Sequence, residues 1–221
     1  MRSKILQFIR KRYGSRGSAL VAVALLLVVA LVSKGQFYSF SNAQQHVIGQ
    51  ANTGAVYSLQ GRATRVADGD TFTLRSGARR HTIRVASIDA PETRGRHGPG
   101  QPFGQRSREV LRGLIHNKEL DLTCYEQDHY GRDVCDVNLP CDEKSFCDPA
   151  QEGSTTTVSK ALVKSGMAWA NEEKRGKFLR DKSLRGLQQE AQQKQLGIWQ
   201  HKDPIEPWVW RYQCWRQKQC K

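Results

Sequence analysis

Three short segments rich in β-branched residues, placed close together and separated by turn signals, constrain the fold most. They are Arg62–Val66, Thr71–Arg75 and His81–Ile88. Asp68-Gly69-Asp70 lies in the first gap and Ser76-Gly77 in the second, and tight turns favour these residue types. The pattern therefore predicts consecutive antiparallel strands.

Helical and strand patterns follow one another through the rest of the chain. Gln105–Ile115 carries apolar residues at helical spacing, which predicts an amphipathic helix. Glu119–Cys124 and Asp133–Val137 flank a turn at Asp128–Gly131, which predicts a β-hairpin.

Two more helices are expected after the hairpin. They are Thr157–Ser165, closed by Gly166, and Lys177–Gln195, closed by Gly197. Residues 138–157 resemble an inserted loop. The order strands, helix, hairpin, helix, helix predicts an α+β domain.

The first 43 residues resemble a targeting element. A cationic stretch up to Arg16 precedes fourteen unbroken apolar residues, Ala19–Val32. Fourteen is fewer than the roughly 20 residues that span a bilayer, which favours a signal peptide. A small-x-small cleavage site at 41–43 lies well beyond the apolar run, so an uncleaved signal anchor remains open. Either outcome places the body outside the cytoplasm, periplasmic, secreted or anchored to the inner membrane. A buried core helix is the alternative.

Charge favours a polyanionic partner. The chain has 35 Lys and Arg against 21 Asp and Glu, a net charge of +14. Seven of the cations and none of the acids lie in residues 1–43, so the body retains 28 cations against 21 acids, or +7. This moderately basic body suits nucleic acid, although many solvated surfaces are as basic.

All six cysteines follow the targeting segment, and an even number in an exported chain favours disulfides over zinc. No Cys-x2-Cys pair is present, and no His stands at a ligand-like spacing from the cysteines. A symmetric hairpin places Cys124 opposite Cys135, within reach of a disulfide. Cys141–Cys147 and Cys214–Cys220 would be local pairs, unless Cys141 or Cys147 reaches the tail.

Three acidic residues stand in loops beside strand ends, where a rigid scaffold presents functional groups: Asp70, Asp89 and Glu92. Such oxygen ligands suit calcium or magnesium. Arg84 and Arg132 could supply planar forks for phosphate oxygens. Together these are the parts of a phosphodiester hydrolase. On composition alone, ordinary turn and capping roles explain the same residues.

Several motifs in order resemble the thermonuclease, or staphylococcal-nuclease-like, family. The resemblance covers about residues 61–211. It is carried by Val66–Thr71, Ile83–Glu92, Asp128–Arg132, Ala161–Ala168, Gln189–Trp199 and Pro207–Arg211. It implies a five-stranded OB-fold barrel with three helices, a fold that often binds oligonucleotides.

The resemblance also implies a calcium site and a general base. Asp70 and Asp89 would bind Ca2+ through their carboxylates, and Ala90 through its backbone carbonyl. Ala90 replaces a Thr of the best-studied member, which matters little for a carbonyl ligand. Glu92 would be the general base that activates water.

The remaining implied residues would bind the substrate. Arg84 and Arg132 would hold the phosphate and stabilise its five-coordinate transition state, leaving 3'-phosphate and 5'-hydroxyl ends. Tyr130 would lie beside the phosphate. His129 replaces a Lys, so its phosphate contact would weaken as the pH rises.

A strictly alternating strand would place Arg84 and Asp89 on opposite faces of the sheet, so the site requires a bulge or bend between them. The five tryptophans could stack on bases, but such residues more often pack in the core. The cations of the last predicted helix are most simply interpreted as its solvent-exposed face. These are Lys177, Arg180, Lys182, Arg185 and Lys194.

We therefore expect a monomeric, calcium-dependent endonuclease that hydrolyses DNA and RNA. Four segments are expected: a targeting segment at 1–43, a polar linker at 44–60, the nuclease domain at 61–200 and a tail at 201–221. If it is not cleaved, the targeting segment would attach the chain to the membrane. An inactive OB-fold nucleic-acid-binding module at the cell envelope is the alternative, and an adhesion scaffold is a third.

Overall fold

A computed structural model describes residues 56–96, 98–140 and 155–220 of the chain. All of them belong to one compact unit, residues 50–221. The predicted targeting segment and the predicted Cys141–Cys147 pair lie outside the described residues. No helix in the described part is long and apolar enough to cross a membrane.

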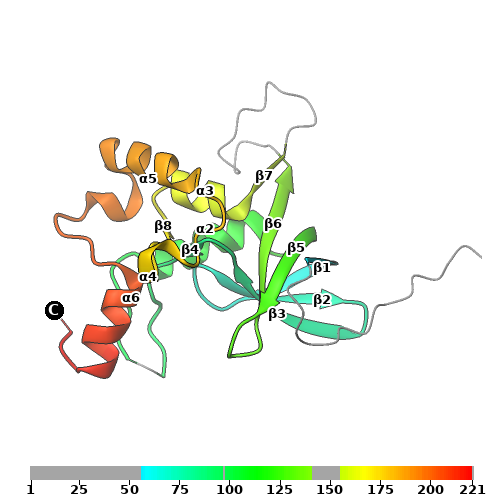
Figure 1. The fold of residues 1–221 in the computed structure, drawn as a ribbon. Helices are drawn as coiled ribbons and strands as arrows, with labels where there is room; N and C mark the ends of the chain where they lie inside the picture. The colour runs from blue at the N-terminus through cyan, green and yellow to red at the C-terminus, as the bar shows by residue number, and fades with distance from the viewer. Residues whose placement is uncertain (1–55, 97, 141–154, 221) are drawn as a thin grey trace, which may run out of the picture. The chain divides into compact units, whose positions relative to one another are not determined.

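Five strands form a closed mixed barrel (Figure 1), which confirms the predicted fold class. Antiparallel pairing gives the order β3-β2-β1-β5-β6, and a parallel pairing of β3 with β6 closes it. The strands are β1 (Tyr57–Val66), β2 (Thr71–Ser76), β3 (Arg79–Val85), β5 (Glu119–Gln127) and β6 (Asp133–Pro140). β1 begins at Tyr57, so it takes in residues that composition assigned to a linker.

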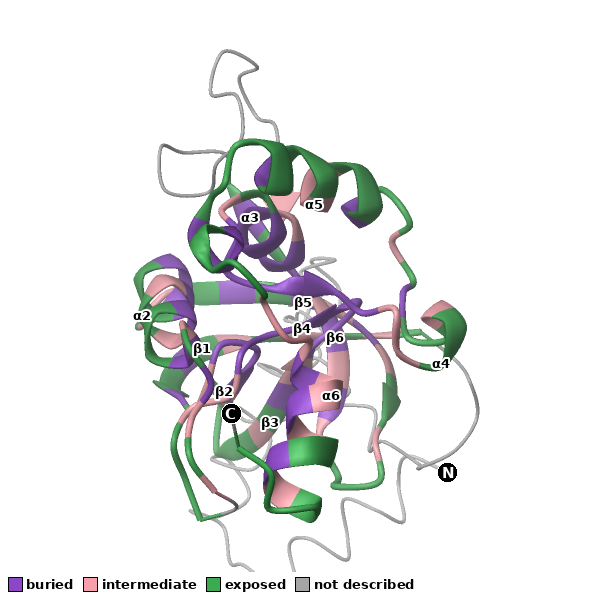
Figure 2. Ribbon diagram, turned by 90° about the vertical axis from the view of Figure 1, so that its left-hand side faces the viewer, coloured by how far each residue is buried: buried purple, intermediate pink, exposed green. Residues whose placement is uncertain are grey.

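The barrel interior follows from alternation along the strands. In β6 every second residue is buried, as expected when successive side chains point to opposite faces. Phe72, Leu74 and Ile83 on neighbouring strands are fully buried. Figure 2 shows this burial running through the strands, while the outer face of the last long helix is exposed.

Three helices lie to one side of the barrel (Figure 1), as predicted. They are α2 (Gly104–Ile115), α3 (Val158–Lys164) and α5 (Leu184–Gln193). α3 contacts β6, α2 and α5, so it joins the helical layer to the barrel. It begins where the Thr157 side chain accepts a hydrogen bond from the Lys160 amide, 3.3 Å away, as a helix N-cap does.

The last predicted helix is shorter than expected. Residues 177–183 were assigned to it, but α5 begins only at Leu184. The hydroxyl of Ser87 accepts hydrogen bonds from the amides of Arg180 and Asp181, at 3.0 and 3.1 Å. Tertiary contacts therefore take two amides that a helix would need. The short α4 (Glu173–Gly176), which has non-helical backbone angles inside it, precedes this segment.

The predicted strand His81–Ile88 is in fact two strands. β3 ends at Val85, and β4 (Ile88–Asp89) begins after Ser87, whose φ is 67°. β4 pairs with β8 (Trp169–Ala170), not with the barrel. This is the bend that a site containing both Arg84 and Asp89 requires.

The β5–β6 hairpin places Cys124 directly opposite Cys135, and a disulfide joins them. A second disulfide joins Cys214 to Cys220. The region expected to be a loop from 138 is partly strand, because β6 continues to Pro140 and pairs with β7 (Thr155–Thr157). The extra pairing extends the hairpin strand past the barrel.

Most tryptophans pack in the interior. Trp169 and Trp199 meet edge to face, with ring centroids 4.3 Å apart, in a small second core beside α5. The chain then passes through η1 (Gly197–Gln200), α6 (Pro207–Trp210) and the π-helical η2 (Arg211–Arg216). Trp210, the last residue of α6, is also buried.

Candidate active site

The turn between β1 and β2 positions Asp70. The carboxylate of Asp68 accepts a hydrogen bond from the Asp70 amide at 3.0 Å, a local bond that fixes the turn. Gly69 is required here, because a Cβ atom would lie 2.6 Å from Cβ of Ala90 and closer still to the hydroxyl of Ser107. The close approach places Asp70 against the loop that follows β4.

The buried carboxylate of Asp70 links three elements. Its Oδ1 accepts a hydrogen bond from the Thr71 hydroxyl at 3.0 Å. Its Oδ2 accepts one from the Ala90 amide at 2.8 Å and forms an ion pair with Nη1 of Arg84 at 2.9 Å. Strand β2, strand β3 and the loop after β4 therefore meet at this carboxylate.

Arg84 joins Asp70 to Asp89. Its Nη2 donates to Oδ1 of Asp89 at 2.9 Å. Burial lowers the pKa of Arg84, but the two carboxylates more than compensate and hold it above its ordinary value. Arg84 thus stays charged although its side chain is only 13% exposed.

Asp89 and Glu92 share a second arginine that the sequence analysis did not assign, Arg211. Its Nη1 lies 3.0 Å from Oδ1 of Asp89 and 2.7 Å from Oε1 of Glu92, and its Nη2 lies 2.7 Å from Oδ2 of Asp89. The structure therefore brings Asp70, Arg84, Asp89 and Glu92 into one cluster.

Two carboxyl groups of this cluster, those of Asp70 and Glu92, hold their protons unusually tightly. Burial raises the pKa of Asp70 to about 6, against the opposing effect of Arg84. Burial also raises the pKa of Glu92 to about 7, although its hydrogen bond with Arg211 lowers it. A carboxyl group with a pKa near neutrality can accept and release a proton at working pH.

Arg132 reaches the cluster from the β5–β6 turn. Both Nε and Nη2 lie 2.7 Å from Oδ2 of Asp128, and Nη1 lies 3.4 Å from the Thr71 hydroxyl. Partial burial raises the pKa of Asp128, but its bonds with Arg132 outweigh this and the pKa is lowered. Because Thr71 also bonds Asp70, one hydroxyl connects Arg132 to the buried carboxylate.

Tyr130 and His129 lie at the tip of the same turn. The Tyr130 side chain is 73% exposed, and the guanidinium carbon of Arg132 lies 5.2 Å from its ring centre. The His129 ring lies 3.8 Å from the Tyr130 ring. These two predicted substrate-binding residues stand beside Arg132 rather than among the carboxylates.

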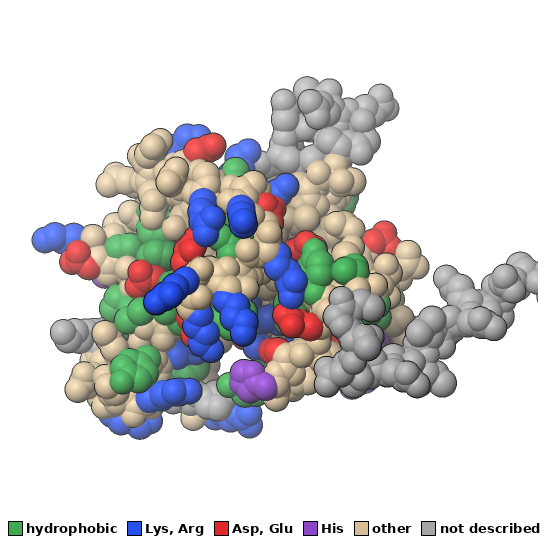
Figure 3. All heavy atoms as spheres, viewed as in Figure 1, with side chains coloured by type: hydrophobic (Ala, Val, Ile, Leu, Met, Phe, Trp, Pro, Cys, Tyr) green, Lys and Arg blue, Asp and Glu red, His purple; other side chains and the backbone are tan. Residues whose placement is uncertain are grey.

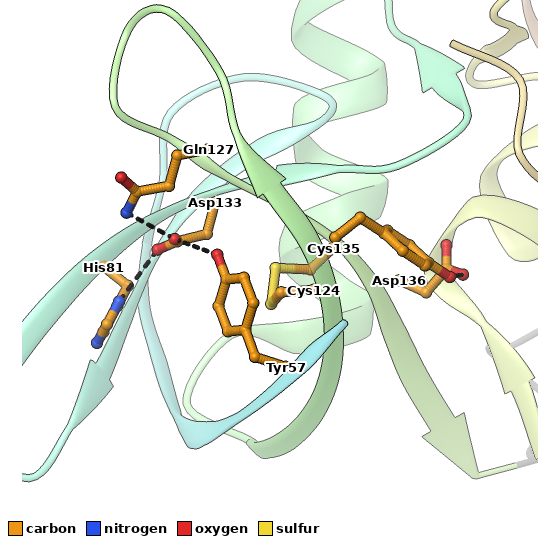
Figure 4. Close-up of a disulfide and its surroundings, with 8 residues drawn as sticks. Tyr57, His81, Cys124, Gln127, Asp133, Cys135 and Asp136 are labelled. Carbon is orange, nitrogen blue, oxygen red and sulfur yellow. Dashed lines mark hydrogen bonds and ion pairs between the residues drawn. A yellow bond between two sulfur atoms is a disulfide. The ribbon is translucent and has the colours of Figure 1, made fainter. Parts of the chain in front are cut away.

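A buried polar network anchors the strand that follows Arg132. Asp133 accepts hydrogen bonds from the Tyr57 hydroxyl at 2.6 Å and from Gln127 at 2.9 Å, and His81 Nδ1 lies 3.0 Å away (Figure 4). Burial and the Asp133 carboxylate raise the pKa of Tyr57 above its ordinary value, so its hydroxyl remains a donor. The Cys124–Cys135 disulfide lies in the same strand pair and fixes it covalently.

The donor set suits a hard cation. Asp70 and Asp89 are almost fully buried carboxylates, and Glu92 lies near them, a set that calcium prefers over softer metals. Within residues 56–96, 98–140 and 155–220, however, no three acidic, His or Cys side chains are already gathered where a metal could bind. The oxygens have the right chemistry, while Arg84 and Arg211 hold them.

Three residues with roles in the geometry were missed by sequence reasoning: Asp128, Thr71 and Arg211. Asp128 stands four positions before Arg132, a spacing that could have indicated the pair. Thr71 was assigned only to a strand. Arg211 lies in the Pro207–Arg211 motif of the resemblance, but nothing in the sequence linked it to the site, because its partners Asp89 and Glu92 lie 122 and 119 positions away.

Comparison with known proteins decides the family. The sequence model described as staphylococcal nuclease homologue matches residues 82–201. The chain belongs to this family. The match begins within β3 and spans the bend, the hairpin and helices α2, α3 and α5, and the β1–β2 turn with Asp70 precedes it.

Individual relatives of the staphylococcal nuclease homologue family agree. An uncharacterised endonuclease of Escherichia coli is 31% identical over 154 residues, which cover 70% of this chain and 86% of the relative. A micrococcal nuclease of Shigella flexneri is 34% identical over 153 residues, 69% of this chain and 80% of the relative. A staphylococcal-like nuclease, CAN1, of Arabidopsis thaliana is 29% identical over 136 residues, which cover 61% of this chain and 34% of the relative.

Membership of this family makes the protein a nuclease, a hydrolase that acts on nucleic acids. That outcome confirms the predicted enzyme class and favours it over an inactive binding module or an adhesion scaffold. The roles of individual residues and of calcium are a separate question.

Proposed function

We propose that this nuclease is a calcium-dependent endonuclease that hydrolyses DNA and RNA and leaves 3'-phosphate and 5'-hydroxyl ends. The observation that carries the proposal is the convergence of Asp70, Arg84, Asp89 and Glu92 at one end of the barrel, with Arg132 linked to them through Thr71. Acids for a cation and a base, with arginines for phosphate, are the groups that phosphodiester hydrolysis needs.

Glu92 is the proposed general base. With a pKa near 7 it can take a proton from a water molecule as that water attacks phosphorus. The bond from phosphorus to the 5' oxygen breaks, the attacking oxygen stays on phosphorus, and the 5' oxygen takes up a proton. The products are a 3'-phosphate and a 5'-hydroxyl.

Arg84 and Arg132 are proposed to stabilise the five-coordinate phosphorus. Each guanidinium group presents two parallel N–H donors, which match two phosphate oxygens. Their carboxylate partners keep them oriented before substrate arrives, so little reorganisation is needed during the reaction. Tyr130 and His129, at the exposed tip of the turn, would contact the neighbouring phosphate.

Asp70, Asp89 and the Ala90 carbonyl are the proposed calcium ligands. Calcium bound there would supply positive charge to the phosphate oxygens. The Ala90 amide bonds Asp70 at 2.8 Å, so Ala90 already lies beside both carboxylates.

One face of the molecule suits a polyanion. Figure 3 shows Lys and Arg side chains gathered near the middle of one face, between the helices and the barrel, with acidic side chains among them. Such a surface attracts nucleic acid by charge without regard to sequence, which fits activity on both DNA and RNA.

We also infer that the protein works outside the cytoplasm, as a monomer. Two disulfides in the described part support an oxidising compartment. The expected targeting segment at residues 1–43 is the sequence feature that supports export. If that segment is not cleaved, it would also attach the protein to the membrane.

End analysis tests the proposed chemistry. We expect cleaved oligonucleotides to accept phosphate from polynucleotide kinase without prior phosphatase treatment, because their 5' ends carry hydroxyls. The 3' ends should resist extension by terminal transferase until phosphatase is added. Products with extendable 3' ends and blocked 5' ends would show that the other phosphorus–oxygen bond breaks.

A further inference from the structure

We propose that Arg211 is an internal cation that occupies the proposed metal-binding carboxylates. Calcium would then bind only when the C-terminal segment Pro207–Arg216 moves away from them. The inference rests on the proposed calcium site. It adds a residue outside the matched family region, and it makes metal binding a competition between calcium and the protein's own guanidinium group.

Arg211 contacts the carboxylates in the way that a bound cation would. Its two terminal nitrogens hold both oxygens of Asp89 and one oxygen of Glu92, all within 3.0 Å. A third carboxylate, that of Glu173, lies 3.9 Å from Nη2 of Arg211. Asp89 is only 1% exposed, so this is a buried, charge-assisted fork rather than a surface ion pair.

Occupancy of Asp89 is what sets up the competition. Its Oδ1 accepts from both Arg84 and Arg211, and its Oδ2 accepts from Arg211. A cation that takes both oxygens of Asp89 as ligands must therefore displace at least one of these bonds, because Oδ1 already accepts two. Arg84 lies within barrel strand β3, whereas Arg211 is attached to a terminal segment, so Arg211 is the arginine free to leave.

Electrostatics favours exchange over joint occupancy. Arg211 and a calcium ion would both lie against the Asp89 carboxylate, which is only 1% exposed, and two cations that close together repel each other.

Hydrogen bonds at both ends hold the segment in place. The indole N–H of Trp215 donates to the Pro99 carbonyl at 3.1 Å, and the Gln101 side chain donates to the Ile205 carbonyl just before the segment. Trp210 is buried next to Arg211, and η2 is a π-helical turn, a rare form that is frequent at functional sites. The segment contains none of the barrel strands, so its release would leave the barrel pairing intact.

A competition of this kind weakens apparent calcium affinity by the fraction of molecules in which the site is free. Removing the competitor should restore the intrinsic affinity. Coupling between two sites commonly lies between about 5-fold and 150-fold. We therefore expect Arg211→Ala and Arg211→Gln to bind calcium about tenfold more tightly than the wild type.

The test measures calcium binding by the full-length protein without substrate, using isothermal titration calorimetry. Arg216→Ala is the matched control, because it removes an exposed cation from the same segment. We expect its affinity to equal that of the wild type. Wild-type or weaker affinity in both Arg211 variants would overturn the inference while leaving the calcium site in place.

Hydrogen exchange of the wild-type protein gives an independent answer that needs no variant to fold. Calcium should speed amide exchange in residues 207–216 and shift tryptophan emission as Trp210 becomes exposed. Unchanged or slower exchange there at saturating calcium would overturn the inference. Absence of calcium binding in wild type and variants alike, with cleavage persisting in chelator, would instead refute the proposed calcium dependence and the inference with it.

Discussion

Arg84 and Asp89 lie on opposite sides of a sharp bend, and their side chains meet across it with Nη2 of Arg84 2.9 Å from Oδ1 of Asp89. Ser87 forms the bend with a φ of 67°, and its hydroxyl accepts the amides of Arg180 and Asp181. A single residue thus sets the chain direction and ties it to the segment before α5.

We expect Ser87→Ala to lower the free energy of unfolding by about 2 kcal/mol, because two partly buried hydrogen bonds lose their acceptor. Ser87→Gly is the matched variant, since it also removes the hydroxyl but adopts a positive φ without strain. Urea unfolding of both separates the two effects. If Ser87→Ala is as stable as the wild type, the hydroxyl does not hold the bend.

Arg84→Lys and Arg132→Lys should each lower turnover by on the order of a hundredfold, since an ammonium group cannot reproduce a two-pronged contact with phosphate. Arg80→Lys, an exposed position on the same strand as Arg84, is the control and should keep its rate. The measurement is kcat on a labelled oligonucleotide with circular dichroism to verify folding. Folded variants with near wild-type rates would make both arginines structural.

The raised pKa values make the metal-free protein less stable as the pH rises. A carboxyl group whose pKa is higher in the folded state contributes stability that is complete below its unfolded pKa and is lost as the pH passes its folded pKa. For Asp70 this window runs from its ordinary value of 3.8 to about 6, and for Glu92 from 4.5 to about 7.

Asp70→Asn should therefore be more stable than the wild type at pH 8 in chelator, by up to about 3 kcal/mol, and should lose that advantage near pH 4. Exposed Asp203→Asn is the control and should show no such gain. Urea unfolding at the two pH values provides the comparison. A less stable Asp70→Asn at pH 8 would mean that Arg84 stabilises the carboxylate more than burial penalises it.

The disulfide in the hairpin should stabilise the turn that carries Arg132. Replacing Cys124 and Cys135 together by Ser should cost about 2 to 3 kcal/mol, the range for a loop of this size, and some activity should survive at low temperature. Replacing Cys214 and Cys220 should affect barrel stability less, because that bridge closes a short loop in the tail. Equal melting temperatures for the wild type and the Cys124 and Cys135 variant would contradict this assignment.

The elements with a local signal could be predicted from the sequence. The β2 strand, the hairpin and helix α2 have clear alternation or helical spacing. The predicted pairing of Cys124 with Cys135 is confirmed, although the hairpin is not symmetric: the register shifts between Cys124 and Glu126. Residues 177–183 have helical spacing too, yet Ser87 takes two of their amides. A contact between segments about 90 positions apart overrides a local preference, and a single sequence does not reveal it.

The same distinction applies to the site. Residues in recognisable motifs, such as Asp70 and Arg84, were named in advance, and the structure brings them together. Arg211 could not be placed, because only the folded chain brings the terminal segment to Asp89. The requirement for a bend was predicted from strand alternation, while its position at Ser87 depends on the pairing of β4 with β8.

Calcium dependence is the central claim, and nicking of supercoiled plasmid by the full-length protein over a series of buffered free calcium concentrations tests it most directly. We predict no cleavage in excess EGTA, recovery as calcium is restored, and poor recovery with magnesium, which demands near-octahedral geometry and keeps its waters. Asp89→Asn should abolish the calcium response. Cleavage at the full rate in excess EGTA would contradict the account.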